Sequence, residues 1–177
     1  MNEIFLTGLS ELDELLNGGF RTGLTLFMIK NKCFEDECFI TTLLNTVREV
    51  NNLESVTCAA MNTDNIETLI KEEPNNRKLI WLVLKEKDDL KDKDIYVRQF
   101  SRYAIHHNKV CFTVSDKNKT LDSLKKESDV IFEVSTSDHN MYKFTLVKDR
   151  HQHISSNNTV KISQDSVLSR FILAATH

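Results

Sequence analysis

The sequence predicts an α/β protein with a mainly parallel sheet flanked by helices and an antiparallel hairpin at its C-terminal edge. Three observations lead to this fold class. Strand-like and helix-like segments alternate from residue 24 to about residue 115. The strand candidates, such as residues 24–29 and 78–84, are apolar throughout, as expected when helices cover both faces of a sheet. After Leu121, two strand candidates follow each other with only a short polar segment between them.

Composition indicates one ordinary globular domain. The chain has 177 residues, of which 40% are hydrophobic and 28% charged, and no linker or repeat divides it. We expect a single domain over residues 1–177, with a core at about 4–150 and a C-terminal extension at 151–177. The sequence shows no signal-peptide pattern and no apolar run long enough to cross a bilayer, so we expect a cytoplasmic protein without membrane contact.

The first predicted helix begins at Ser10, with Asp13 at the spacing of a capping box, and ends at Gly18 and Gly19. After the strand at 24–29, apolar residues recur at helical spacing and predict an amphipathic helix from about 36 to 50. These apolar residues are Phe39, Ile40, Leu43, Leu44 and Val47.

The remaining elements continue the alternation. In order, they are a strand at 55–60, a helix at about 64–72, a strand at 78–84, a helix at about 93–107 and a strand at 109–115. Strands at 129–135 and 142–150 would form the hairpin. The last residues, 166–177, fit either a helix or a strand.

Cysteines and histidines suggest no metal centre. We interpret the cysteines as reduced thiols rather than a disulfide framework. They are Cys33, Cys38, Cys58 and Cys111. The C-x4-C spacing of Cys33 and Cys38 could hold a metal, but no second pair is nearby. His151 and His153 are also suitably spaced, but nothing clearly joins them, so we favour surface histidines.

Several segments carry a family resemblance. They are "TGLSELDELLNGGFRTGLTLFMI" (7–29), "DIYVRQFSRYAIHHNKVCFTVSD" (94–116), and "LKKESDVIFEV" (124–134) with "YKFTLVKDR" (142–150). In this order and spacing the chain resembles the RecA-like ATPases of the KaiC and DnaB-helicase branch, over most of residues 4–150. The resemblance implies a three-layer RecA-like core, which is a P-loop NTPase fold.

The phosphate-binding loop of such enzymes has the pattern G-x-x-x-x-G-K-[S/T], which supplies backbone N–H groups, a cation for phosphate and a hydroxyl for Mg²⁺. The residues at those four positions are Ile29, Phe34, Glu35 and Asp36. No glycine occurs from residue 24 to 42, and residues 35–37 would place three carboxylates at a helix N-terminus. The resemblance therefore implies a degenerate Walker A loop, and we expect no nucleotide cofactor.

The other catalytic positions that the resemblance implies are also changed. Ala60, Met61 and Asn62 follow the second core strand, where the family has a water-activating Glu. Leu82 and Val83 stand where the metal-linked Asp should be. Because phosphoryl transfer depends on these groups, we expect no catalytic residues and predict a pseudo-ATPase rather than an enzyme.

Lys148 and Arg150 do match the family. In the helicase branch this Lys-x-Arg reaches a nucleotide bound by a neighbouring subunit, as an arginine finger, so the pair is a candidate inter-subunit finger. The alternative, which we favour, is that two long cations at the end of an edge strand point to solvent.

Four lysines occupy the position of a DNA-facing loop in the helicases. They are Lys117, Lys119, Lys125 and Lys126. Acidic residues alternate with them and no aromatic side chain intervenes, so a solvated mixed-charge loop is favoured over a nucleic-acid site.

The function expected from the resemblance is that of a catalytically inactive RecA/KaiC/DnaB-like protein. It would act as a scaffold or regulatory subunit through contacts with a protein partner or in a homo-oligomer, in DNA replication, recombination or KaiC-like regulation. One alternative is an ATP-independent nucleic-acid-binding module that uses the loop from Lys117 to Lys126. A second alternative is an ATPase with an unrecognised site.

Overall fold

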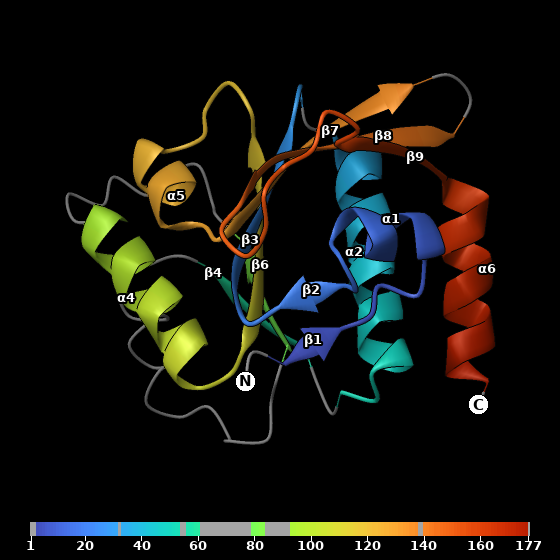
Figure 1. The fold of residues 1–177 in the computed structure, drawn as a ribbon, viewed down its shortest axis with the longest axis horizontal. Coiled ribbons are helices and arrows are strands. Elements are labelled where there is room, and N and C mark those ends of the chain that lie inside the picture. Colours follow the sequence, from blue (N-terminus) through green and yellow to red (C-terminus); the bar gives the residue numbers. More distant parts are fainter. Residues whose placement is uncertain are drawn as a thin grey trace.

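The computed structural model describes residues 3–31, 33–53, 56–60, 79–83, 93–137 and 140–176. A seven-stranded sheet runs through the described part of the chain (Figure 1). Its strands, in spatial order, are β4 (Val56–Ala60), β5 (Leu79–Val83), β6 (Val110–Asp116), β3 (Gly23–Ile29), β7 (Val130–Ser137), β8 (Met141–Asp149) and β9 (Thr159–Ser163). The neighbours from β4 to β7 are parallel, whereas β8 and β9 are antiparallel additions at one edge.

Helices cover both faces of this sheet (Figure 1). One face carries α1 (Ser10–Leu15), α2 (Phe34–Val50) and α6 (Gln164–Ala175), and the other carries α4 (Lys93–His106) and α5 (Asp122–Glu127). A second, two-stranded antiparallel sheet pairs β1 (Ile4–Phe5) with β2 (Phe20–Arg21). Among the described helices, none combines the length and the apolar composition needed to span a membrane.

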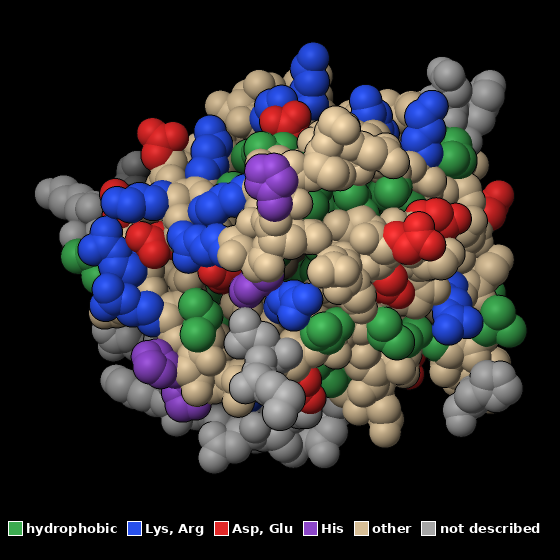
Figure 2. Space-filling view, in the orientation of Figure 1, with side chains coloured by type: hydrophobic (Ala, Val, Ile, Leu, Met, Phe, Trp, Pro, Cys, Tyr) green, Lys and Arg blue, Asp and Glu red, His purple; other side chains and the backbone are tan. Residues whose placement is uncertain are grey.

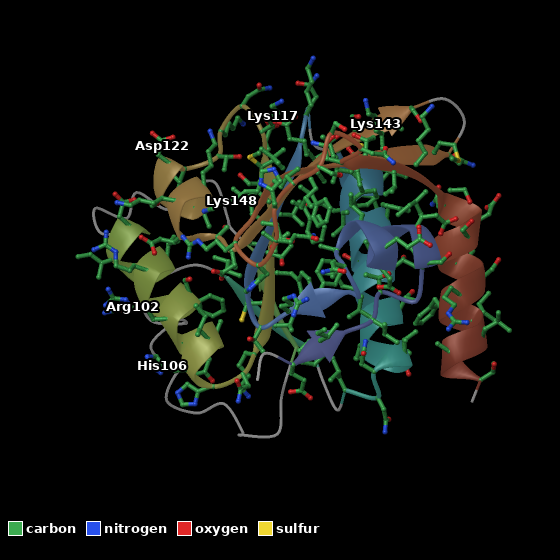
Figure 3. All side chains as sticks on the ribbon, in the orientation of Figure 1. Arg102, His106, Lys117, Asp122, Lys143 and Lys148 are labelled. Carbon is green, nitrogen blue, oxygen red and sulfur yellow. The ribbon has the colours of Figure 1, made fainter. Side chains whose placement is uncertain are left out.

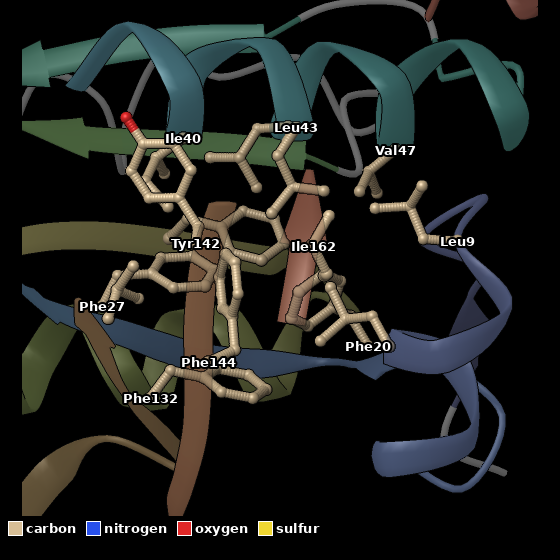
Figure 4. Close-up of a cluster of buried hydrophobic side chains, with 14 of the residues drawn as sticks. Leu9, Phe20, Phe27, Ile40, Leu43, Val47, Phe132, Tyr142, Phe144 and Ile162 are labelled. Carbon is tan, nitrogen blue, oxygen red and sulfur yellow. The ribbon is translucent and has the colours of Figure 1, made fainter. Parts of the chain in front are cut away.

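Strand β3 lies inside the sheet, and both of its faces are buried. On the α2 side, Phe27 stacks between Phe112 of β6 and Phe132 of β7, with ring centroids 6.0 and 5.7 Å apart (Figure 4). Phe20 meets Phe112 edge-on at 4.9 Å. These rings form the centre of the larger core, as their offset and edge-on geometries favour.

The opposite face of β3 packs against α4 and α5. Leu24, Leu26 and Met28, which alternate with the residues facing α2, contact a second cluster that includes Val97 and Phe100 of α4. The continuous apolar run of β3 therefore follows from its position between two helical layers.

The predicted α/β class, the mainly parallel sheet and the antiparallel hairpin at its edge are confirmed. Helix α2 begins at Phe34, slightly before the predicted start, and contributes the expected buried face. The helix predicted at 64–72 lies outside the described residues. The tail that fitted either element is a helix, α6, and a third antiparallel strand, β9, precedes it.

The capping box predicted at the start of α1 is wrong. Ser10 is the first helical residue, and its hydroxyl donates to the Glu11 carboxylate at 3.0 Å. Asp13 instead accepts a hydrogen bond from the backbone N–H of Thr7 at 2.7 Å. The residue before the helix is Leu9, whose N–H donates to the Thr7 hydroxyl, and no described side chain caps the N–H groups of the first turn.

Candidate functional site

The turn between β3 and α2 stands where the sequence resemblance places a phosphate loop. It joins the carboxyl end of a central parallel strand to a helix N-terminus, the arrangement that places phosphate sites in α/β proteins. Helix α2 starts at Phe34, the position of the second loop glycine, and Asn31 adopts a positive φ of 54°. The path of strand, turn and helix is therefore present, with different side chains.

The carboxylate of Asp36, a residue of α2 itself, lies at the N-terminus of that helix. Its side chain is buried and accepts hydrogen bonds from the backbone N–H and the thiol of Cys33, both at 3.1 Å. The Thr136 hydroxyl of β7 donates to its other oxygen at 3.4 Å. A carboxylate at this position is favoured by the helix dipole, and it uses an N–H group that a bound anion would need.

The charge of Asp36 affects its neighbours. Burial, reinforced by the nearby Asp36 carboxylate, raises the pKa of Tyr142 to about 12. The pKa of the Cys33 thiol is also raised, since backbone hydrogen bonding at Asp36 lowers it but the thiol's bonds to the Asp36 and Glu35 carboxylates outweigh that effect. The pKa of Glu35 is lowered by its own backbone N–H and by the Cys33 thiol. The turn therefore favours the anionic form of Glu35 and the neutral form of the Cys33 thiol.

The remaining loop positions do not form an anion site. Ile29 is buried in the core, whereas Phe34 is 75% exposed and Glu35 points to solvent. A phosphate at this turn would meet a carboxylate in place of lysine and would lack the hydroxyl that ligates Mg²⁺.

The neighbouring strand ends offer no replacement chemistry among the described residues. Strand β4 ends at Ala60 and β5 at Val83, after Leu82, as the sequence indicated. Asp116 ends β6, and its carboxylate accepts from the backbone N–H of Asn118 at 2.9 Å, which stabilises a turn. Met61 and Asn62 lie outside the described residues.

Lys148 and Arg150 are both anchored at the end of α5 (Figure 3 labels Lys148). The Lys148 ammonium donates to the main-chain carbonyls of Lys125 at 3.0 Å and Lys126 at 2.9 Å. Arg150 donates to the same Lys126 carbonyl at 2.6 Å and to the Asp129 carboxylate at 3.0 Å. Burial, and then the charge of Arg150, lower the pKa of Lys148. Both cations therefore cap a helix C-terminus in this chain.

This cation pair is remote from the turn before α2. Arg150 is level with Leu24, because Asp129 bonds both residues through its main chain. Leu24 and Lys30 are about 20 Å apart along an extended strand. A finger role would require a second molecule, and that role stays a prediction.

The four lysines of the candidate nucleic-acid loop separate into two pairs. Lys117 and Lys119 follow β6 at the carboxyl edge of the sheet, where the Lys117 ammonium pairs with Glu133 of β7 at 2.8 Å. Lys125 and Lys126 lie on α5 and are exposed. The structure therefore does not bring the four lysines together as one row.

The described residues contain no group of three or more potential metal ligands. Cys33 and Cys38 are exposed and Cys111 is buried, and none of these three described cysteines forms a disulfide. His153 is exposed, but the Nε2 atom of His151 is buried and makes no hydrogen bond within the described part of the structure.

Asp129 is a structural residue that the sequence patterns did not identify. Its buried carboxylate accepts from the Leu24 N–H at 2.9 Å and binds Arg150. In the sequence, Asp129 stands at the start of a strand candidate. No pattern predicted that this position lies beside the Lys-x-Arg segment in the fold.

No protein-family model matches the chain, and no curated protein matches it. Function is therefore inferred from the geometry of the turn and the surface described above.

Proposed function

We propose that this protein is a catalytically silent member of the RecA-like class that acts through protein contacts, as a scaffold or regulatory subunit. The observation that carries the proposal is the buried Asp36 carboxylate at the start of α2, bonded to the N–H group of Cys33. A helix N-terminus that serves as an anion site in an active enzyme is filled here by the protein's own anion.

The surroundings of Asp36 support the same proposal. The turn keeps its place at the carboxyl end of a central parallel strand, where α/β proteins bind ligands. Phosphoryl transfer depends on positioning and charge neutralisation by a loop lysine, a metal and a base. At the corresponding loop positions the chain has Phe34, Glu35 and Asp36. In this proposal the fold therefore serves to present surfaces for protein contacts rather than a catalytic site.

Nucleotide binding provides the direct test. Titration of the purified protein with Mg-ATP in a calorimeter should give no saturable heat, and a phosphate-release assay should give no turnover above buffer. An active ATPase run in parallel shows that both assays work. Saturable binding or turnover by the wild-type protein would instead support the alternative of an ATPase with an unrecognised site.

The finger role can be tested on a partner ATPase recovered with the tagged protein from its native host. If the Arg150 guanidinium reaches a nucleotide bound by the partner, this protein should stimulate ATP hydrolysis by the partner, and Arg150→Ala should lower that stimulation. Arg170→Ala, which removes an exposed arginine on α6, is the matched control. Unchanged turnover with Arg150→Ala would leave Arg150 with its capping role alone.

A second candidate function is ATP-independent nucleic-acid binding. It is favoured by one observation: Lys117 and the neighbouring Lys119 follow β6 beside Lys30, since the Lys117 N–H donates to the Ile29 carbonyl at 2.8 Å. Single-stranded DNA should then bind at low salt, weaken as salt rises, and be lost in a Lys117→Ala/Lys119→Ala variant. Absence of binding at low salt would reject this candidate.

A further inference from the structure

The outer surface of α4 carries an unusual combination of side chains. Its inner side is buried against the sheet through Val97, Phe100 and Ala104. On the opposite side, residues spaced by three, four and three positions form one stripe. The stripe consists of Ile95, Arg98, Arg102 and Ile105. Its isoleucines are 53% and 47% exposed, so aliphatic surface lies at both ends of two arginines.

Helix α5 extends this stripe sideways. Arg98 of α4 donates to the Glu127 carboxylate at 3.3 Å, and the Ser101 hydroxyl donates to the Glu127 carbonyl at 3.1 Å, which joins the two helices. Lys125 and Lys126 of α5 are exposed beside this junction. We call the stripe together with these two lysines the α4–α5 surface. Blue side chains gather over these helices at the left of Figure 2.

The cations of this surface are only partly neutralised. Glu127 is occupied by Arg98, and Asp122 lies 3.9 Å from the Lys125 ammonium. No described residue forms an ion pair or hydrogen bond with the side chain of Arg102, which Figure 3 shows projecting from α4. The four cations of this surface exceed the three acidic residues of the two helices, Asp94, Asp122 and Glu127, by one, although the whole chain has a net charge of −3.

The lysines of α5 stand on a fixed backbone. The Lys125 and Lys126 carbonyls accept from the Lys148 ammonium, and Arg150 bonds the Lys126 carbonyl as well. These contacts hold the last turn of α5 against β8 and add two cations beside it. A partner would therefore meet a helix end whose backbone is already held in place, which lowers the entropy lost on binding.

We propose that the α4–α5 surface binds an acidic amphipathic helix of a protein partner. Carboxylates of that helix would pair with Arg102, Arg98 and the α5 lysines, and its aliphatic residues would cover Ile95 and Ile105. A nucleic-acid backbone would use the cations but leave both isoleucines exposed, so a protein fits this surface better. The inference rests on the proposed scaffold role, for which it names a docking surface and the chemistry of the partner.

Peptide binding to the full-length protein tests the inference. The probe is a fluorescent helical peptide that carries glutamates four positions apart and leucines on the same side, and anisotropy reports its binding at low salt. One comparison peptide replaces the glutamates with glutamine, and another replaces the leucines with serine. A fluorescent single-stranded oligothymidylate tests the nucleic-acid reading.

Two substitutions separate charge from apolar contact. Arg102→Glu should weaken binding of the acidic peptide about tenfold or more, and Ile105→Ser should weaken it by a smaller factor of about three. Arg170→Glu on α6 changes charge equally at a remote exposed site and should leave affinity within about twofold. Circular dichroism and Lys126→Glu, a second charge reversal on the same surface, separate loss of binding from misfolding.

The outcomes are distinct. Binding of the acidic peptide that depends on both its glutamates and its leucines, with loss in Arg102→Glu and Ile105→Ser, supports the inference. No binding up to ~100 μM, or equal binding of oligothymidylate that ignores Ile105→Ser, overturns it. Nucleotide binding in the Mg-ATP titration would reject the silent-ATPase proposal without changing these peptide results, so the two failures can be told apart.

Discussion

A buried carboxylate lies at each end of strand β3, but the two carboxylates have different kinds of hydrogen-bond partners. At the carboxyl end, Asp36 accepts from an N–H, a thiol and a hydroxyl, and its nearest partner, Cys33, is three residues away. At the amino end, Asp129 accepts from the Leu24 N–H, 105 residues away, and from the Arg150 guanidinium. The Asp36 end is stabilised mainly by local contacts, with one longer bond from Thr136 at 3.4 Å, whereas the Asp129 end depends on long-range contacts.

This difference indicates which end of β3 tolerates change. The network of Asp129 joins β3 and β7 to the residue that follows β8, so its loss would loosen the sheet itself. The network of Asp36 caps only helix α2. Another side chain at this position would need only to accept a hydrogen bond from a free N–H group at the start of that helix. Substitutions at this turn are therefore expected to destabilise the fold less than substitutions around Asp129.

Gly23→Ala should give the largest effect and would break the amino-end network. Gly23 has a φ of 124°, and a Cβ there would collide with the Asp129 carboxylate. We expect a loss of about 3 kcal/mol in the free energy of unfolding, measured by denaturant titration. Gly18→Ala is the control, because its φ is also positive but its nearest contact lies at 3.8 Å. Equal losses in the two variants would show that the collision with Asp129 contributes nothing.

Asp129→Ala tests the same end without backbone strain. It leaves the Leu24 N–H without its acceptor and removes one of the two acceptors of the Arg150 guanidinium, which is 43% exposed and keeps its bond to the Lys126 carbonyl. We expect a loss of about 2 kcal/mol in the free energy of unfolding. Hydrogen exchange at the Leu24 amide should accelerate as well. An unchanged exchange rate there would contradict the long-range role of this carboxylate.

Asp36→Ala should cost less, about 1 kcal/mol, because it removes a local helix cap and a favourable interaction with the helix dipole. The loss should appear in denaturant unfolding, with the exposed Glu35→Ala as the matched control. A loss greater than that of Asp129→Ala would reverse the comparison between the two ends.

Tyr142 offers a pH test at the carboxyl end. Its pKa is raised to about 12 in the folded protein, from an ordinary value of 10.0. The folded state therefore retains the phenol proton longer than the unfolded state, so this contribution to stability is present below pH 10 and is lost as pH rises toward about 12. Difference absorbance of wild type and Tyr142→Phe should show this late ionisation. Tyrosinate formation near pH 10 at this residue would contradict it.

The sequence predicted those elements whose pattern is strong. The apolar run 24–29 and the helical spacing of 36–50 gave β3 and α2, because each pattern reflects burial on its own element. The changed residues of the turn, Phe34, Glu35 and Asp36, were also readable, since a phosphate loop requires particular residue types.

Long-range contacts could not be predicted in the same way. Nothing in the local pattern indicated that Thr136 and Tyr142 approach Asp36, or that Lys148 caps α5. Strand β9 is short and only partly buried, so its alternation gave little signal. The Ser10 capping box had the right spacing, but the helix begins at Ser10 itself and Asp13 accepts from the N–H of Thr7 instead.

The position of β3 in the sheet also has a kinetic consequence. Its hydrogen-bonded neighbours, β6 and β7, begin at Val110 and Val130, more than 80 residues after β3 itself. The apolar segment from Gly23 to Ile29 therefore stays unpaired during folding until these later segments pack against it. Such non-local pairing makes folding slow and leaves a β-prone segment exposed meanwhile. The central strand of the folded sheet is thus also an apolar segment that can aggregate before folding is complete.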